Sequence, residues 1–349
     1  MKKNLCIFIG YTSLIREECY GTEISILKLA HQLSKLYNIY IVTLSDDESV
    51  TTDNFIYINY KNLHINVDIL IISRYINYFM YCFFQPCKKI YLWVHDITVL
   101  AYYQSFVLEN NGKAYMHNFL DRIDKIVLLS EWHKTFFQSY YQIPDNKIII
   151  IGNGITINDF IPLIDGDNSL KQTNRFIWTS CLNRGIERCI EIIQMIHNVF
   201  PDTELHIFRN YDTKQEFVDS VKDLSYIHFH GNVNNKQIIE EFKKSEYWFY
   251  PTTFSETYCI SALESQMSGC IAISTDVASL NTTVGDHGLL IKNTLSNKEI
   301  ADEVISLMKN DELKNKLRIK GQEWAKKQDW DIIAKKWLKL FNHKKFWIF

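Results

Sequence analysis

The chain has 349 residues, of which 47% are hydrophobic and 14% aromatic, and its formal net charge is -2. This length suits two domains of ordinary size, each with its own core, and this composition excludes an intrinsically disordered chain. The near-neutral charge excludes a nucleic-acid-binding polycation, so we expect no nucleic-acid partner.

Short runs rich in Ile, Val, Leu and Tyr alternate with longer stretches of helical period, a pattern typical of doubly wound α/β folds with parallel sheets. In the first half, strands are expected at residues 5–10, 39–43, 55–58, 68–72, 89–95, 125–129 and 147–151. A helix opened by Gly21 and Thr22 separates the first two strands. Its apolar residues recur at i, i+3, i+4 and i+7 and should face the sheet: Ile26, Leu29, Ala30 and Leu33.

A second series of strands begins at Arg175. Strands are expected at 176–179, 204–208, 226–229, 247–250 and 271–274, with helices near 186–198, 214–223, 235–244 and 257–268. The stretch 155–174 has the composition of a linker. No G-x-G-x-x-G follows the first strand, and nicotinamide enzymes normally place those glycines at the pyrophosphate, so an NAD cofactor is disfavoured.

Targeting and redox features indicate a cytoplasmic protein. The first ten residues lack the long apolar core and the cleavage site of a signal peptide. No apolar stretch approaches the roughly 20 residues that span a bilayer. The eight cysteines form no C-x-x-C pair, which argues against a zinc site and against a dense disulfide framework.

The most specific segment is 251–264, PTTFSETYCISALE. It follows a predicted strand and runs into a predicted helix, so Glu256 and Glu264 should lie where open α/β folds bind ligands. If the whole span is helical, they lie roughly 12 Å apart along the axis, which suits two ends of one extended ligand. Outside this context, a helix-capping Glu256 and a solvated Glu264 would be the simpler interpretation.

This segment resembles the E-x7-E motif of glycosyltransferase family 4, the retaining glycosyl transferases group 1 with the GT-B fold. The resemblance implies two Rossmann-like domains facing a central cleft: an acceptor-side domain over 1–160 and a nucleotide-sugar donor domain over 175–328. It also implies that Glu256 binds hydroxyls of the transferred sugar and that Glu264 binds the ribose. Thr257 and Tyr258 would contact the donor between them.

Residues 179–187, TSCLNRGIE, follow a predicted strand and open a helix. A helix N-terminus binds anions, and Arg184 adds a permanent charge that suits a diphosphate. The family usually has Lys-Gly where this chain has Arg184-Gly185, with another basic residue earlier in the loop that is absent here. The resemblance implies that Arg184 takes the diphosphate and that Ser180 or backbone groups replace the other cation. A surface arginine beside a turn is the alternative.

Residues of the first half also match the family. Gly21 and Thr22 match its glycine-containing loop, where a residue without Cβ lets backbone N–H groups approach the donor phosphates. Thr22 as a helix N-cap is an alternative, and both can hold. His95 matches a histidine that contacts the donor sugar, although a lone histidine at a strand end is more often a satisfied polar residue.

The run HGNV at 230–233 follows another predicted strand. In the family this loop lies beside the nucleotide base, so backbone atoms of Asn232 or Val233 would bind it; ordinary turn chemistry is the alternative. The resemblance extends from residue 1 to about 330 and is strongest over 176–291.

The resemblance implies a hexosyltransferase that moves a sugar with retention to a glycan, protein-linked glycan or lipid-linked acceptor. The catalytic residues would be His95, Arg184 and Glu256. We favour a UDP-sugar over a GDP-sugar and expect no cofactor. No metal requirement is expected either, because Arg184 and backbone N–H groups can stabilise the diphosphate leaving group. The oligomeric state stays open. The alternatives are a catalytically silent sugar-nucleotide-binding protein, an inverting transferase and a UDP-sugar epimerase.

The chain end is predicted to be helical. In the family a C-terminal helix returns to the first domain, and residues 329–349 are the candidate, with an apolar face of Ile332, Ile333, Trp337, Leu338 and Phe341. The basic, aromatic tail 344–349 and the aromatic stretch 75–84 could also meet an anionic membrane peripherally. Core packing with solvated lysines is the favoured interpretation of both, which leaves a soluble acceptor preferred.

Overall fold

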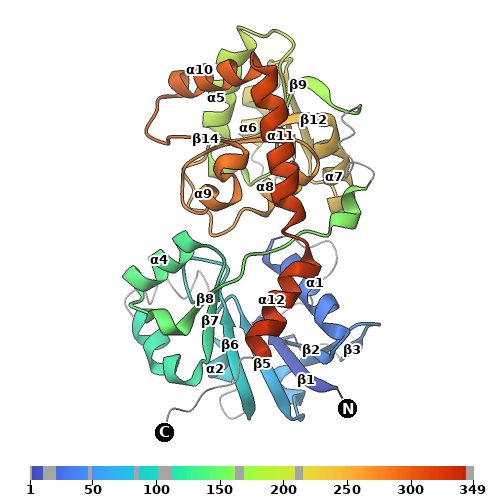
Figure 1. The fold of residues 1–349 in the computed structure, drawn as a ribbon, viewed down its shortest axis with the longest axis vertical. Coiled ribbons are helices and arrows are strands. Elements are labelled where there is room, and N and C mark those ends of the chain that lie inside the picture. The colour runs from blue at the N-terminus through green and yellow to red at the C-terminus, as the bar shows by residue number, and fades with distance from the viewer. Residues whose placement is uncertain are drawn as a thin grey trace. The chain divides into compact units, whose positions relative to one another are not determined.

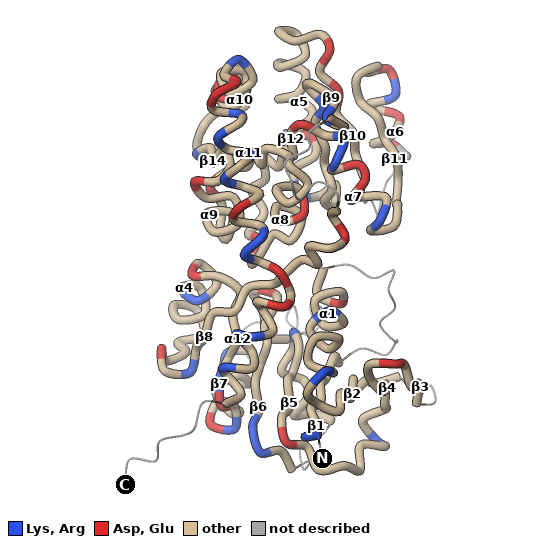
Figure 2. Tube along the Cα trace, turned by 45° about the vertical axis from the view of Figure 1, so that its right-hand side comes forward, with Lys and Arg blue, Asp and Glu red and all other residues tan. Residues whose placement is uncertain are grey.

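The computed structural model describes residues 2–10, 21–45, 49–81, 86–100, 112–161, 169–208 and 215–342. The chain forms two compact units: unit 1 comprises Met1–Asn153 with Trp330–Phe349, and unit 2 comprises Gly154–Asp329. Each unit contains one sheet with helices packed on it (Figure 1). Acidic and basic residues are interspersed along both units (Figure 2), in keeping with the near-neutral net charge.

The sheet of unit 1 has eight strands in the order β3-β4-β2-β1-β5-β6-β7-β8. Every neighbouring pair is parallel except β3 with β4. The strands are β1 (Lys3–Phe8), β2 (Tyr37–Thr43), β3 (Val50–Thr51), β4 (Ile56–Asn59), β5 (Val67–Ser73), β6 (Cys87–Trp93), β7 (Lys125–Leu128) and β8 (Ile148–Ile150). The helices include α1 (Thr22–Ser34), α2 (Tyr78–Tyr81), α4 (Glu131–Tyr140) and α12 (Trp330–Asn342).

The sheet of unit 2 has six parallel strands in the order β11-β10-β9-β12-β13-β14. The strands are β9 (Gln172–Trp178), β10 (Glu204–Phe208), β11 (Ile227–Gly231), β12 (Ser245–Tyr250), β13 (Ile271–Thr275) and β14 (Leu289–Ile291). The helices are α5 (Ile186–His197), α6 (Gln215–Val221), α7 (Asn235–Lys244), α8 (Ile260–Met267), α9 (Leu280–Thr283), α10 (Asn297–Met308) and α11 (Asp311–Lys326). This is the 3-2-1-4-5-6 order of a Rossmann-like sheet, in which the direction of winding reverses between β9 and β12.

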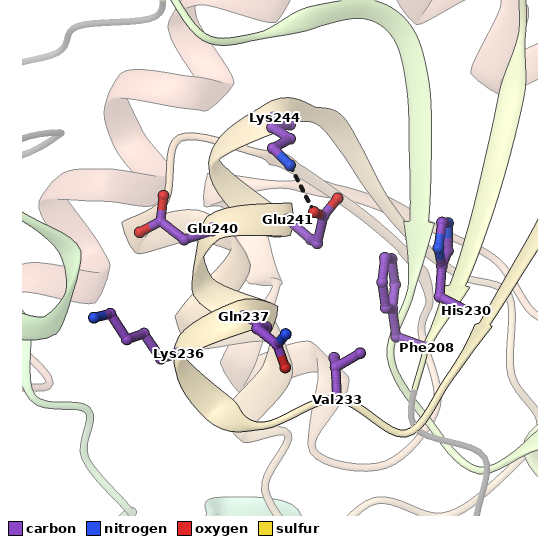
Figure 3. Close-up of a pocket in the computed structure, with 8 residues that line it drawn as sticks. All are labelled: Phe208, His230, Val233, Lys236, Gln237, Glu240, Glu241 and Lys244. Atoms are coloured by element: carbon purple, nitrogen blue, oxygen red, sulfur yellow. Dashed lines mark hydrogen bonds and ion pairs between the residues drawn. The ribbon is translucent and has the colours of Figure 1, made fainter.

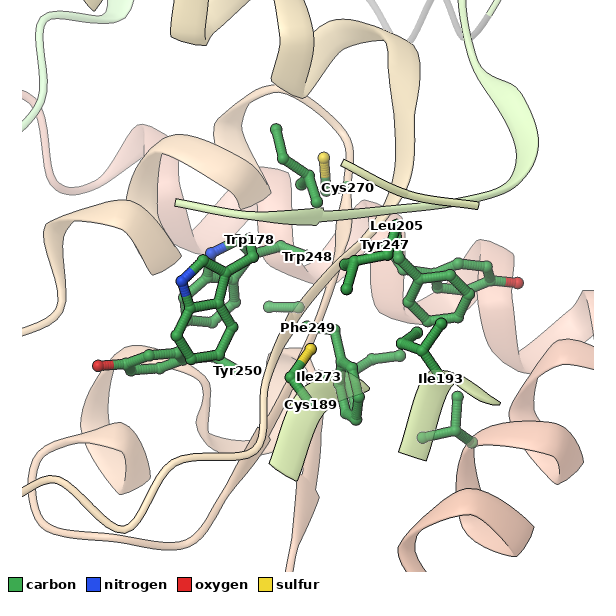
Figure 4. Close-up of a cluster of buried hydrophobic side chains, with 14 of the residues drawn as sticks. Trp178, Cys189, Ile193, Leu205, Tyr247, Trp248, Phe249, Tyr250, Cys270 and Ile273 are labelled. Atoms are coloured by element: carbon green, nitrogen blue, oxygen red, sulfur yellow. The ribbon is translucent and has the colours of Figure 1, made fainter. Parts of the chain in front are cut away.

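Large aromatic side chains fill the core of unit 2 around β9 and β12 (Figure 4). All six residues of β12 are buried, as expected for a central strand of a parallel sheet covered on both faces. The ring of Trp178 lies 5.1 Å from that of Tyr250, and the ring of Phe176 lies 4.7 Å from that of Tyr247. The core therefore holds rigidly the two strands between which the winding reverses.

The α/β class and the parallel, doubly wound sheets predicted from the sequence are confirmed. Two strands were not predicted, the two-residue β3 and the three-residue β14. Unit 2 also begins earlier than the predicted linker, because the N–H of Ile155 donates to the carbonyl of Gln328 and Ile157 bonds the Asp329 carboxylate. Residues 162–168 of the predicted linker lie outside the described residues.

Helix α12 packs against α1 and the sheet of unit 1. The Trp337 ring lies 5.2 Å from that of Trp93, and the Phe341 ring lies 5.4 Å from that of Tyr91. The expected apolar face is corrected at two positions: Ile332 is 38% exposed and Leu338 is half-buried, whereas Trp330, Ala334 and Leu340 are buried. The helix turns by 100° per residue, so Ile332 falls beside the contact stripe.

The two segments considered for a membrane contact differ in what the structure describes. Tail residues 344–349 lie outside the described residues. In the stretch 75–84, the described part 75–81 buries Tyr75, Tyr78 and Phe79 in the core of unit 1, which favours core packing. Among the described helices, none is both long enough and apolar enough to cross a membrane.

Replacing Trp337 with alanine should lower the free energy of unfolding by about 3–5 kcal/mol, because the fully buried ring is lost and a cavity remains. Urea unfolding followed by circular dichroism measures this change. The matched control is Ile332→Ala on the exposed side of the same helix, which should cost well under half as much. Equal losses for the two variants would contradict the packing of α12.

Candidate functional site

The loops that follow β9 and β12 meet at the carboxyl edge of the unit 2 sheet, where its winding reverses. Open α/β sheets bind ligands at this position because the two loops diverge there. After β9, a short 3-10 turn over Leu182–Arg184 ends at Gly185, and α5 begins at Ile186. After β12, an extended loop carries Glu256 before α8 begins at Ile260. The strand and helix positions thus place both predicted motifs at one edge.

Gly185 lets the two loops pack against each other. Its φ is 110°, a value that residues with a Cβ rarely adopt. A Cβ at this position would lie 3.7 Å from both the carbonyl oxygen of Pro251 and the Cα of Thr252. The Thr252 hydroxyl donates to the carbonyl oxygen of Arg184 at 2.6 Å, which fastens one loop to the other.

An ion pair between Arg184 and Glu256 lies where the loops meet. Nη1 of Arg184 donates to Oε1 of Glu256 at 2.7 Å, and the guanidinium lies 4.2 Å from the centre of the Phe254 ring. Burial opposes the charge of Arg184, but the Glu256 carboxylate holds the pKa of this arginine above its ordinary value. The side chain of Arg184 keeps 32% of its surface exposed, against 11% for Glu256. A permanent cation is therefore presented to solvent beside the N-terminus of α5.

Tyr250 and Ser180 complete the network around Glu256. The Tyr250 hydroxyl donates to Oε1 of Glu256 at 2.8 Å and accepts from the Ser180 hydroxyl at 3.3 Å. Burial, with the Glu256 carboxylate adding to it, raises the pKa of Tyr250 far above its usual range, so the phenol stays a donor. The structure thus brings together three predicted residues, Ser180, Arg184 and Glu256, with Tyr250, which the sequence analysis missed.

The second glutamate of the E-x7-E pair lies on α8. Because α8 starts at Ile260, the span from Glu256 to Glu264 is only partly helical. The separation expected for one continuous helix therefore does not apply to these two glutamates. Both carboxylates raise the pKa of the Cys259 thiol, after the larger effect of its burial.

The two residues that follow Glu256 differ in exposure. Thr257 is half-buried, whereas Tyr258 is buried, and its burial raises the pKa of its phenol.

The loop after β11 borders a pocket of about 420 Å³ on the side of the sheet covered by α7 (Figure 3). Val233 lines this pocket, whereas Asn232 is exposed and does not. The rings of Phe208 and His230 stack 4.4 Å apart on one wall. The other lining residues come from α7: Lys236, Gln237, Glu240, Glu241 and Lys244. The pocket offers a flat aromatic wall opposite a polar helix.

In unit 1, Gly21 and Thr22 lie at the start of α1. Gly21 is the N-cap, with a φ of 62°, and Thr22 is the first helical residue, so Thr22 as the N-cap is wrong. His95 follows β6 and is buried beside the Trp93 ring, 4.3 Å away. Burial first, and then the charges of Arg74 and His133, hold the pKa of His95 well below its ordinary value, which keeps its ring neutral.

Arg74 is a second residue that the sequence analysis missed. It follows β5 and adopts a φ of 69°. Its Nε donates to Oδ2 of Asp96 at 2.6 Å, and its Nη1 lies 3.5 Å from the carboxylate of Glu23. Its position directly after a central strand is the sequence signal from which Arg74 could have been predicted. Arg74 links the residue after His95 to the first turn of α1.

Comparisons with known proteins agree with this architecture. Residues 168–324 match the family described as "Glycosyl transferases group 1". Phosphatidyl-myo-inositol mannosyltransferase of Mycobacterium tuberculosis is 19% identical over 200 residues, which cover 55% of this chain and 53% of that protein. The chain thus spans about half the length of this curated relative.

Several solved structures resemble nearly the whole chain, and two of them serve as examples. Sucrose-phosphate synthase from Thermosynechococcus elongatus has a TM-score of 0.78 at 13% identity, covering 97% of this chain and 98% of that one. HepE of Anabaena, solved in complex with UDP, has a TM-score of 0.73 at 13% identity, covering 97% and 99%. These likenesses show the GT-B fold.

Replacing Tyr250 with phenylalanine should lower the free energy of unfolding by about 1.5–3 kcal/mol, the usual effect of losing a hydrogen bond to a charged group. The variant loses the hydroxyl that donates a hydrogen bond to Glu256 and keeps the aromatic ring. Urea unfolding is the measurement. Tyr140→Phe, at a site 45% exposed, is the matched control and should stay within about 0.5 kcal/mol of the unmodified protein. An unchanged free energy of unfolding in Tyr250→Phe would contradict the hydrogen bond from Tyr250 to Glu256.

Proposed function

We propose that the protein is a glycosyltransferase that moves a hexose from a nucleotide sugar to a hydroxyl group, because residues 168–324 match the glycosyl transferases group 1 family and the chain has the GT-B fold. The observation that carries the proposal is the Arg184–Glu256 network at the carboxyl edge of the unit 2 sheet. A cation, a helix N-terminus and a buried carboxylate stand together there within the matched segment.

Arg184 and the N-terminus of α5 are proposed to receive the diphosphate of the donor. The first N–H groups of a helix point toward its N-terminal end, and the positive end of the helix dipole favours an anion. Arg184 stands directly before this end, and its guanidinium can donate two parallel hydrogen bonds to phosphate oxygens. These groups stabilise the negative charge that develops on the leaving diphosphate as the sugar bond breaks.

Glu256 is proposed to bind hydroxyls of the transferred sugar, and Glu264 the ribose. A carboxylate accepts hydrogen bonds from sugar hydroxyls, and Tyr250 keeps Glu256 in place when Arg184 turns to a phosphate. Ser180, Thr257 and Tyr258 would complete the donor site, as the family resemblance implies.

The loop of Asn232 and Val233 is proposed to hold the base. We favour UDP as the nucleotide, supported by the fold shared with HepE, which was solved with UDP. The stacked rings of Phe208 and His230 beside Val233 offer a flat surface near this loop.

In unit 1, Gly21, Thr22 and His95 are proposed to contribute to the donor site, as the family resemblance implies. His95 would act as a neutral hydrogen-bonding group, since its low pKa keeps the ring uncharged at physiological pH.

For the acceptor, we propose a glycan or glycoconjugate hydroxyl. The name of the mycobacterial relative denotes transfer of mannose to a phosphatidyl-inositol, so a lipid-linked acceptor is one member of this class. We propose transfer with retention, in which a departing diphosphate oxygen takes the proton of the acceptor hydroxyl on the same face of the sugar.

Glu256→Gln should lower turnover about 100-fold, because the substitution weakens the contact of this side chain with the reacting sugar in the transition state. Glu264→Gln should instead weaken binding of the free nucleotide about tenfold, as expected for a lost hydrogen bond to the ribose. Steady-state kinetics with a UDP-sugar and calorimetric titration with UDP separate the two effects. Glu303→Gln, on the exposed side of α10, is the control. Full turnover in Glu256→Gln would refute its role.

Transfer should persist in excess EDTA, because Arg184 and the N-terminus of α5 can receive the diphosphate without a bound Mg²⁺. The measurement compares initial rates of sugar transfer with EDTA and with added Mg²⁺ or Mn²⁺. A strict requirement for either ion would overturn the proposed role of Arg184 as the principal cation at the diphosphate.

A further inference from the structure

Two neighbouring strands of unit 2 carry three metal-ligating side chains on one face. In the parallel ladder of β10 and β11, His206 and His228 are direct partners, so their side chains stand side by side. Glu204 lies two residues before His206 and points to the same face. Among the residues that the structure describes, Glu204, His206 and His228 form a group whose ligand atoms all lie within 4.8 Å of one another.

The distances within this cluster suit a tetrahedral ion. Nε2 of His206 lies 3.1 Å from Oε2 of Glu204, and Nε2 of His228 lies 3.7 Å from Oε1 of the same carboxylate. Ligands bound to Zn²⁺ at about 2.0–2.1 Å in a tetrahedron are about 3.3 Å from one another. The two separations, one to each oxygen of the Glu204 carboxylate, bracket this value, and all three ligand atoms lie within 4.8 Å of one another.

His228 has a ligand atom directed into the cluster. Its Nε2 is buried, and no residue in the described part of the chain makes a hydrogen bond to it. A buried ring nitrogen without such a bond carries a desolvation cost that a bound ion would remove. The Glu204 side chain is 49% exposed, which gives an ion access from solvent and leaves room for a water as the fourth ligand.

A second set of groups supports His206 from behind. Its Nδ1 lies 2.9 Å from Nε2 of His230 and 3.1 Å from Nη2 of Arg175. The guanidinium of Arg175 can only donate, so without an ion Nδ1 of His206 accepts from it. With an ion on Nε2, the ring proton resides on Nδ1, the guanidinium of Arg175 turns away to Glu241, and Nδ1 donates to Nε2 of His230, the outer hydrogen bond that metal-bound histidines usually make. Arg175 keeps its own partner in the Glu241 carboxylate, 2.5 Å away, which balances its charge.

We propose that Glu204, His206 and His228 bind one divalent transition-metal ion, with Zn²⁺ as its typical occupant. Two imidazole nitrogens and one carboxylate oxygen suit Zn²⁺, whereas Mg²⁺ and Ca²⁺ take oxygen ligands almost exclusively. The ion would tie the edge strand β11 to β10. The three ligands lie apart from Arg184 and Glu256, whereas His230, the outer partner of His206, is also a wall of the pocket beside the loop of Asn232 and Val233.

The test is calorimetric titration of the EDTA-treated, dialysed full-length protein with Zn²⁺, together with thermal unfolding at matched Zn²⁺ concentrations. The expected result is one ion per chain and a rise in Tm, because a ligand that binds only the folded state stabilises it. His228→Ala and Glu204→Gln should each weaken Zn²⁺ binding about 100-fold and abolish the rise in Tm. Both positions are partly exposed, so these variants should fold.

His64→Ala, which removes an exposed histidine of unit 1, is the matched control and should bind Zn²⁺ as the unmodified protein does. Thermal unfolding in EDTA should give the same Tm for all four proteins, which checks folding independently of the ion. No Zn²⁺ binding by the unmodified protein, or equal binding by His228→Ala, would overturn the proposal. The readout needs no sugar transfer, so its outcome is independent of the proposed function.

Discussion

The ion pair between Arg184 and Glu256 is the interaction on which the carboxyl edge of unit 2 depends. The Glu256 carboxylate is taken largely out of water, and the cost of that desolvation is offset only when the charge keeps good partners. Tyr250 supplies a second donor to the carboxylate, and the Phe254 ring covers the guanidinium. A ligand phosphate that attracts Arg184 therefore leaves Glu256 with one donor still in place, so the pair can be exchanged without stranding a buried charge.

Strand order explains why these residues meet. In the order 3-2-1-4, the loop after β9 and the loop after β12 leave neighbouring strands in a sheet whose helices lie on opposite faces. The αL glycine Gly185 then allows α5 to begin close to the backbone of Thr252. The parallel ladder of β9 with β12 fixes the spacing of the two strands, and their stacked aromatic side chains anchor both strands in the core.

Sequence periodicity was enough to predict the buried strands and most of the helices, because continuous apolar runs and 3.6-residue spacing are local signals. It missed β3 and β14, since a short edge strand and a three-residue strand carry too few residues for a pattern. The motifs around Arg184 and Glu256 were predicted from a resemblance. Tyr250 and Arg74 were not, because their roles arise from partners 6 and 22 residues away that only the fold brings together.

The cluster of Glu204, His206 and His228 could not be predicted for the same reason, and the absence of a C-x-x-C pair is a signal against cysteine-bound zinc alone. The alternations E-x-H and H-x-H are visible in the sequence, but they become one site only through the register of β10 with β11.

That register also carries a functional consequence. β11 is the edge strand, held by ladder bonds on one side, and it leads directly into the loop of Asn232 and Val233. An ion at its amino end would restrict the strand as a whole, and so order the loop at its carboxyl end, without touching any ligand bound there.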